Sequence, residues 1–99
     1  MQHRYFYVYI MSNPKRNVIY TGITGNLIQR VWEHKDKIVG GFTQKYNVID
    51  LLHYEIFETP IEAIEREKQI KSWSRKRKDR LIQTSNPTLK DLSDNINSW

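Results

Sequence analysis

The acidic residue best placed for chemistry is Glu67, which lies in a segment whose apolar residues recur at helical spacing. At about 100° per residue, Glu67 falls between Ala63 and Ile70 on the inward stripe of that helix. A carboxylate among apolar neighbours is costly unless it is paired, protonated or bound to a cation. Two interpretations remain open, namely an ion pair with Lys71 one turn later and a functional carboxylate.

Arg30 and His34 lie four residues apart, so both should project from one edge of the helix that follows residue 26. The planar fork of an arginine can hold phosphate oxygens in a bidentate grip and stays charged at any working pH. The alternatives are an ordinary solvated arginine and an exposed helix histidine. Because His3 and His53 are isolated in the sequence, a histidine-built metal site is not expected, and His34 is a candidate proton shuttle.

Tyr9 and Tyr20 are the candidate phenols. A tyrosine acts as a general base only if its pKa of about 10 is lowered, which nearby cations would do. Each tyrosine on a strand, taken singly, is more often part of the packing, and Tyr5 and Tyr7 fit that interpretation. The chemistry therefore depends on whether the fold brings these side chains together.

A basic stretch runs from Arg66 to Arg80 around Trp73. Contacts of such residues with phosphates release counterions and add affinity that is independent of base sequence. A solvated helical face is the alternative, but the one-signed run adjoins the candidate site and favours phosphate contact. The predicted nucleic-acid-binding residues are Arg30, Lys71, Arg75, Lys76, Arg77 and Lys78.

The first elements expected to position these residues form a hairpin. Residues 5–11 are aromatic and β-branched, and a period of two places odd-numbered residues on one face and even-numbered residues on the other. Residues 12–17 have turn chemistry, and residues 18–20 resume the apolar pattern. Tyr9 and Tyr20 should then lie close together at one end of a sheet.

A helix should follow the hairpin. The segment from Gly22 to Gly25 breaks the strand pattern, and Asn26 is placed to cap a helix from Leu27 to about Lys37. The residues expected to bury one face of this helix are Leu27, Ile28, Val31 and Trp32.

The second half of the chain predicts one more strand and further helices. After a loop at Gly40-Gly41, residues 48–57 suggest a third, well-buried strand of imperfect period. Thr59 to Glu62 is a capping box with proline at the first helical position, and the helix should continue at least to Trp73. The remaining expectations are a short helix over residues 75–83, a stop at Asn86-Pro87, and a last amphipathic turn or two carrying Leu89, Leu92 and Ile96.

Length and composition favour one folded domain over residues 1–99. The chain has 38% hydrophobic residues and no cysteine, so its stability should come from packing rather than disulfides, and a reducing, cytoplasmic setting is expected. No apolar run approaches the roughly 20 residues of a membrane span. Sixteen Lys and Arg against eleven Asp and Glu give a net charge of +5, which favours a polyanionic partner.

The order of these features resembles the GIY-YIG nuclease family, and specifically its small stand-alone members. The two name motifs match Tyr7–Tyr9, where the opening glycine is replaced, and Tyr20–Gly22. Gly22 then leads through Asn26-Leu27 to Arg30, and a later helix carries Glu67. The resemblance covers most of the chain, and its specificity comes from this order and spacing.

The resemblance implies roles for individual residues. Tyr9 and Tyr20 would position or deprotonate the attacking water, and His34 would join the proton transfer. Arg30 would bind the scissile phosphate, and Glu67 would be the sole protein ligand of a divalent cation, Mg²⁺ or Mn²⁺. Asn86 is a candidate for an asparagine that closes the site in many members.

Together these observations predict an α+β fold, with a small three-stranded, mostly antiparallel sheet flanked by helices in the order β-β-α-β-α-α. The expected activity is that of a metal-dependent DNA endonuclease that hydrolyses phosphodiester bonds with one divalent cation. The alternatives are a nucleic-acid-binding protein on the same scaffold with little or no cleavage, and a plain protein-interaction module. The preferred DNA structure, including single-stranded DNA, the use of RNA and the oligomeric state are left open.

Overall fold

A computed structural model of the chain describes residues 4–37, 40–97 and 99. Three strands form one antiparallel sheet in the order β2-β1-β3, with β1 in the centre. The strands are β1 (Phe6–Ser12), β2 (Ile19–Thr24) and β3 (Asp50–Phe57). The α+β class and the antiparallel sheet predicted from the sequence are confirmed.

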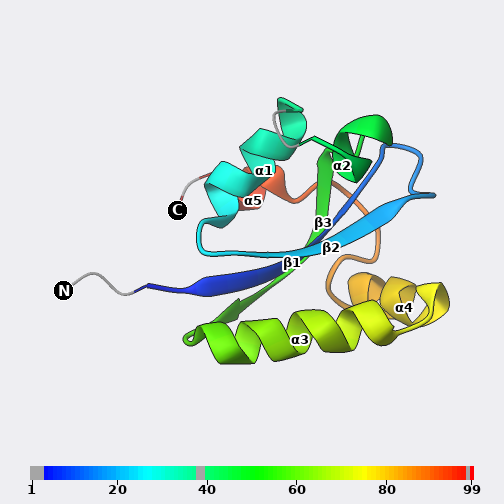
Figure 1. The fold of residues 1–99 in the computed structure, drawn as a ribbon. Coiled ribbons are helices and arrows are strands. Elements are labelled where there is room, and N and C mark those ends of the chain that lie inside the picture. Colours follow the sequence, from blue (N-terminus) through cyan, green and yellow to red (C-terminus); the bar gives the residue numbers. More distant parts are fainter. Residues whose placement is uncertain (1–3, 38–39, 98) are drawn as a thin grey trace.

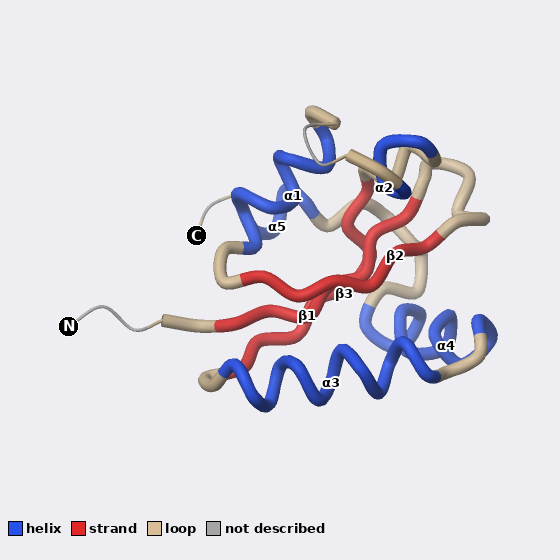
Figure 2. Tube along the Cα trace, viewed as in Figure 1, coloured by secondary structure: helices blue, strands red, loops and turns tan. Residues whose placement is uncertain are grey.

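Helices cover both faces of this sheet (Figures 1 and 2). One layer holds α1 (Leu27–Lys35), α2 (Phe42–Lys45) and α5 (Ser93–Ile96), and the other holds α3 (Pro60–Ser72) and α4 (Arg75–Ser85). The predicted element order is confirmed, with α5 at the last amphipathic turn expected near Ile96 and the short helix α2 in addition. The one-turn helix α2 was not predicted from the sequence, which indicated only a loop at Gly40-Gly41. Gly41 precedes the helix with a φ of 75°, a conformation that glycine adopts readily.

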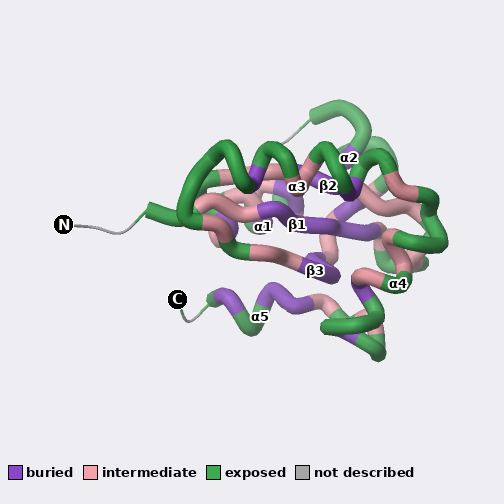
Figure 3. Tube along the Cα trace, turned by 90° about the horizontal axis from the view of Figure 1, so that it is seen from below, coloured by how far each residue is buried: buried purple, intermediate pink, exposed green. Residues whose placement is uncertain are grey.

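The period of two along β1 divides the core into two parts. Tyr9 and Met11 pack with α1 and α5 on one face, whereas Val8 and Ile10 pack with α3 and α4 on the other. The central strand is therefore buried along most of its length, and α3 lies across it with its outward side exposed (Figure 3).

Local sequence signals set the helix ends. Asn26 Oδ1 accepts a hydrogen bond from the amide of Gln29 at 3.1 Å, which makes it the N-cap of α1. Thr59 caps α3 in the same way by accepting from the amide of Glu62, and proline follows at the first helical position. Both predicted starts are confirmed.

The predicted break at Gly22 is wrong, because β2 continues through it to Thr24. Gly22 pairs with Tyr9 in the sheet, and a methyl group on Gly22 would lie only 2.5 Å from Cζ and the hydroxyl oxygen of Tyr9. Glycine here marks the close approach of a ring to the backbone rather than a turn.

The predicted buried face of α1 also needs correction. Trp32 is 46% exposed, whereas His34 is only 2% exposed. Leu27, Val31 and His34 are spaced i, i+4, i+7 and form the buried stripe, and Trp32 lies about 100° further around the helix than Val31. His34 is therefore part of the interior rather than of a polar edge.

The imperfect period of the third strand has a structural cause. Ile10 pairs with His53, but Met11 pairs with Leu51, so the register shifts by one residue at Leu52. This extra residue places two successive side chains on the α4 side, because Leu52 belongs to the core part that contains Ile82 of α4, and His53 Nδ1 lies 3.1 Å from Ser85 Oγ of the same helix. Alternation therefore fails at this point of the strand.

Candidate active site

Tyr9, Tyr20 and His34 form an aromatic cluster between the sheet and α1. The Tyr9 and Tyr20 ring centroids are 6.3 Å apart, and each lies within 6 Å of the His34 ring. The Tyr9 hydroxyl is 3.3 Å from His34 Nε2, and this contact is buried. The predicted proximity of Tyr9 and Tyr20 is confirmed.

Gly22 makes room for this cluster. Tyr9 is 1% exposed, and its ring lies over the Cα of its cross-strand partner Gly22. A Cβ at Gly22 would also approach Tyr20 Cε1 to 3.0 Å. The glycine therefore allows the sheet to carry both phenols at one place.

The ionisation of the cluster follows from its burial. Burial and the neighbouring Tyr20 raise the pKa of Tyr9 well above its usual value of 10, although the positive charge of Arg30 opposes this. Burial and Arg30 lower the pKa of His34 below its usual 6.5. At neutral pH the cluster is a protonated phenol beside a neutral imidazole.

Arg30 presents an incompletely bonded guanidinium to this cluster. Its Nε lies 3.3 Å from Glu33 Oε1, within ion-pair distance. Among the described residues this buried Nε makes no hydrogen bond, nor does His34 Nδ1. A buried donor without a partner is costly, so the site retains donor capacity for an anion. Glu33 was not anticipated from the sequence, although its i, i+3 spacing from Arg30 is a usable signal.

Glu67 approaches from the opposite layer. It lies on α3, which packs across β1 and β2, and its negative charge contributes to the raised pKa of Tyr9. Its side chain is 17% exposed, and Oε2 lies 3.6 Å from Lys71 Nζ. The ion pair considered as an alternative is therefore present, but it is long, and its lysine is half exposed. Such pairs contribute little to stability.

The other predicted site residues lie elsewhere. Asn86 is 2% exposed and caps the end of α4, and its side-chain amide donates to the carbonyls of Leu52 and Lys90. This amide ties the chain after α4 to β3. A role for Asn86 in closing the site stays a prediction.

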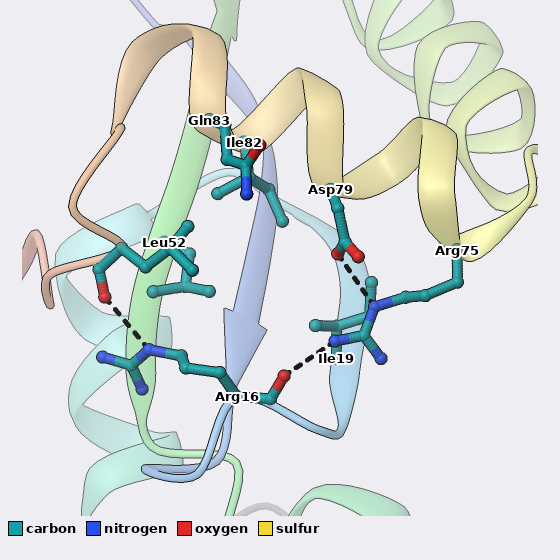
Figure 4. Close-up of a pocket in the computed structure, with 8 residues that line it drawn as sticks. Arg16, Ile19, Leu52, Arg75, Asp79, Ile82 and Gln83 are labelled. Carbon is teal, nitrogen blue, oxygen red and sulfur yellow. Dashed lines mark hydrogen bonds and ion pairs between the residues drawn. The ribbon is translucent and has the colours of Figure 1, made fainter.

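Arg75 of the basic stretch is already engaged in the fold. Its guanidinium bonds to Asp79 and to the carbonyls of Arg16 and Asn17, which holds the turn between β1 and β2 against α4 (Figure 4). Arg16 and Arg75 border a small cavity of about 80 Å³ beneath α4 (Figure 4). Arg75 therefore has a structural role besides the predicted contact with nucleic acid.

Trp73 organises two other cations of the basic stretch. The guanidinium carbon of Arg77 lies 4.1 Å from the centroid of its ring, and that of Arg66 lies 5.1 Å away. Arg66 also forms a two-pronged ion pair with Glu55 of β3. Because these contacts fix the guanidinium groups, the surface carries positive charge in defined positions.

A partly buried ionic network lies on the α4 side of the sheet. His53 Nε2 lies 2.8 Å from Glu55 Oε2, and His53 Nδ1 lies 3.1 Å from Ser85 Oγ. Burial alone would raise the pKa of Glu55, but hydrogen bonds from His53 and Arg66 outweigh it and lower the pKa to about 2. His53 is thus a structural partner, which its isolated position in the sequence did not reveal.

Comparison with known proteins shows the family of this chain. Residues 5–80 match the family model described as the GIY-YIG catalytic domain, and the chain belongs to that family. A UPF0213 protein of Natronomonas pharaonis is 38% identical over 76 residues, which cover 77% of this chain and 88% of the relative. A UPF0213 protein of Clostridium perfringens is 33% identical over 91 residues, 92% of this chain and 97% of the relative.

A solved structure supports the fold independently. The solution NMR structure of a UPF0213 protein from Bacillus halodurans matches with a TM-score of 0.57, over 88% of this chain and 92% of that chain. The sequence identity is 24%, so this likeness supports the fold alone.

Within the described ranges, no helix of this chain is long and apolar enough to cross a membrane.

Proposed function

We propose that this protein is a metal-dependent endonuclease that hydrolyses DNA phosphodiester bonds with one divalent cation. The observation that carries the proposal is the convergence at Tyr9. Its buried hydroxyl lies 3.3 Å from His34 Nε2, and the charges of both Arg30 and Glu67 act on it. A candidate phosphate binder and a carboxylate thus act electrostatically on one phenol that contacts a candidate proton acceptor.

Arg30 would bind the scissile phosphate. Its buried Nε has a donor to spare, and a guanidinium can offer two parallel N–H groups to phosphate oxygens. Glu33 balances its charge in the free protein. A phosphate that replaces this carboxylate would gain stabilisation as negative charge builds on its oxygens during hydrolysis.

His34 is the better proton acceptor of the cluster in the free protein. The lowered pKa of its imidazole keeps it neutral at pH 7, whereas the raised pKa of Tyr9 keeps the phenol protonated. Through the contact between them, the Tyr9 hydroxyl would take a proton from water while it passes its own to His34 Nε2. Tyr20 would orient the water beside this pair.

The residues present fit a cation that is held by one carboxylate. The described part of the chain contains no group of three His, Cys, Asp or Glu residues arranged to hold a metal ion. Mg²⁺ accepts one or two protein carboxylates when water and substrate phosphate complete its shell, and Glu67 supplies one partly exposed carboxylate near Tyr9. A bound Mg²⁺ or Mn²⁺ would stabilise charge on the phosphate and on the leaving oxygen.

The basic residues of α3 and α4 would bind the flanking phosphates. Lys71 is exposed on α3. On α4, Lys76 and Arg77 are exposed and Lys78 is partly exposed. Their contacts would be sensitive to salt and independent of base sequence.

One observation favours the alternative of a protein that binds nucleic acid without cutting it. The Glu67 carboxylate, the proposed metal ligand, is already paired with Lys71.

Cleavage of plasmid, single-stranded and branched DNA tests the proposal, with Mg²⁺, Mn²⁺ or chelator. Arg30→Ala and Glu67→Gln should each reduce the rate by at least about 100-fold, the effect of removing one group that stabilises the transition state. Glu65→Gln, on an exposed position of the same helix, is the matched control and should cut like wild type.

Cleavage that needs no metal, or that persists in both variants at the wild-type rate, would refute the mechanism. Salt-sensitive binding of all substrates without cleavage would support the nucleic-acid-binding alternative. A protein that neither binds nor cuts DNA would point to an interaction module.

A further inference from the structure

An exposed aromatic row extends from the active-site cluster to the surface. The Tyr20 ring lies 6.4 Å from the Phe42 ring, and the Phe42 ring lies 4.8 Å from the Tyr46 ring, measured between centroids. Phe42 is 48% exposed and Tyr46 is 42% exposed. The row therefore begins beside the candidate chemistry and ends in solvent, along α2.

This exposure has no explanation in packing. Large aromatic side chains usually bury most of their surface, whereas Phe42 at the start of the one-turn helix α2 and Tyr46, its C-cap residue four positions later, are both partly open to solvent. Phe42 covers one side of Tyr20, but about half of its own surface stays open. Exposed apolar surface of this kind, continuous with a site, marks a binding region.

The surroundings of the row are polar and basic. Lys45 Nζ lies 5.4 Å from the centroid of the Tyr46 ring. Beside Tyr46 is an open hollow of about 550 Å³, bordered by Lys15 and other residues of the turn between β1 and β2, and by Lys45 and Asn47. Pro14 and Val18 add apolar surface to this lining, and a polyanion with flat apolar rings matches both the cations and the apolar faces.

We propose that Phe42 and Tyr46 form a stacking platform for unpaired nucleobases next to the phosphate bound at Arg30. Paired bases in a duplex are stacked on each other and offer no free face to an aromatic side chain, so the platform selects strands with unpaired nucleotides. The backbone of the same strand would run past Lys15 and Lys45. This proposal rests on the proposed function, because it names the substrate form of that site.

Binding measurements in chelator separate this platform from the catalytic steps. Fluorescence anisotropy would compare a labelled single strand of mixed sequence, the same strand with consecutive abasic nucleotides, and the blunt duplex. Wild type should bind the intact strand most tightly. Phe42→Leu and Tyr46→Leu keep apolar cover but remove the flat ring, and each should weaken that binding by about fivefold or more.

Matched controls exclude a change in the fold. Phe42→Trp restores a flat ring and should bind like wild type or better, and Ile61→Ala removes an exposed apolar group from the opposite layer. Thermal melting should show all variants folded. The abasic strand should bind wild type and both leucine variants equally, since it has no bases to stack.

Two results would overturn the platform while leaving the nuclease proposal intact. One is equal affinity of wild type for the intact strand, the abasic strand and the duplex. The other is unchanged affinity of both leucine variants for the intact strand. A concentration-dependent dimer that Phe42→Leu dissociates would assign the row to a second copy of the chain, and absence of any nucleic-acid binding would overturn the proposed function itself.

Discussion

Gly22→Ala tests the idea that the sheet leaves space for Tyr9. The new methyl carbon would lie 2.5 Å from Tyr9 Cζ and 3.0 Å from Tyr20 Cε1, whereas carbon atoms in favourable contact are about 3.5–4.0 Å apart. The Tyr9 ring must therefore move by about 1 Å or more. Because Tyr9 is 1% exposed and packed against Tyr20 and His34, it cannot move without disturbing its neighbours.

The expected cost combines two opposing effects. Overpacking of a buried site costs about 1–3 kcal/mol, and replacing glycine within a strand recovers roughly 0.5–1 kcal/mol of backbone entropy. The free energy of unfolding should fall by about 1–2 kcal/mol, which lowers the Tm by roughly 4–15 °C for a domain of this size. A reacting group displaced by about 1 Å should also reduce cleavage on the order of 100-fold.

Thermal melts and urea titrations measure the stability, with Gly25→Ala as the control. No atom lies within 4 Å of a methyl group added at Gly25, so that variant should stay within about 0.5 kcal/mol of wild type. The double variant Tyr9→Leu/Gly22→Ala gives the decisive comparison. If Gly22→Ala costs as much in the Tyr9→Leu background as in the wild-type background, contact with the ring is not the reason for the glycine.

Two further predictions concern pH. Because the pKa of His34 is lowered in the folded state, the unfolded chain binds more protons below pH 6.5, and stability should fall as the pH drops through that value; His34→Gln should remove this part of the Tm difference between pH 8 and pH 5, and parallel curves for the two proteins would contradict it. The pKa of Glu55 is about 2 when folded, so this carboxylate stabilises the fold above about pH 4.5 and loses its contribution as the pH falls toward 2. Glu55→Gln should cost roughly 3 kcal/mol at pH 7 in urea titrations, with a gap that narrows below pH 4.5, whereas a gap independent of pH would show that ionisation of Glu55 is irrelevant.

Several features of this fold follow from local sequence alone. Asn26 and Thr59 begin helices because their side chains accept hydrogen bonds from amides three residues later, a contact that needs no distant partner. The alternation along β1 is also local, because successive side chains of a strand point in opposite directions. It assigns Tyr9 and Val8 to opposite faces of the sheet.

The resemblance to the family predicted the candidate site residues, but not their environment. Tyr9 and Tyr20 were expected to be neighbours through a hairpin, and they are. The burial of His34 follows from packing of α1 on the sheet, and with it the lowered pKa of its imidazole. Sequence spacing could not rank Tyr9 and His34 as proton acceptors, because desolvation depends on what covers each group.

Other features were decided only by tertiary contacts. Gly22 signals a break when its neighbours in sequence are considered, but its role is set by Tyr9 on the next strand. The register shift at Leu52 belongs to the pairing of β3 with β1, and α2 brings Phe42 against Tyr20 from more than 20 residues away. Local signals thus determined where the helices begin and how side chains alternate along β1, while contacts between distant segments determined the buried face of α1 and which side chains lie close together.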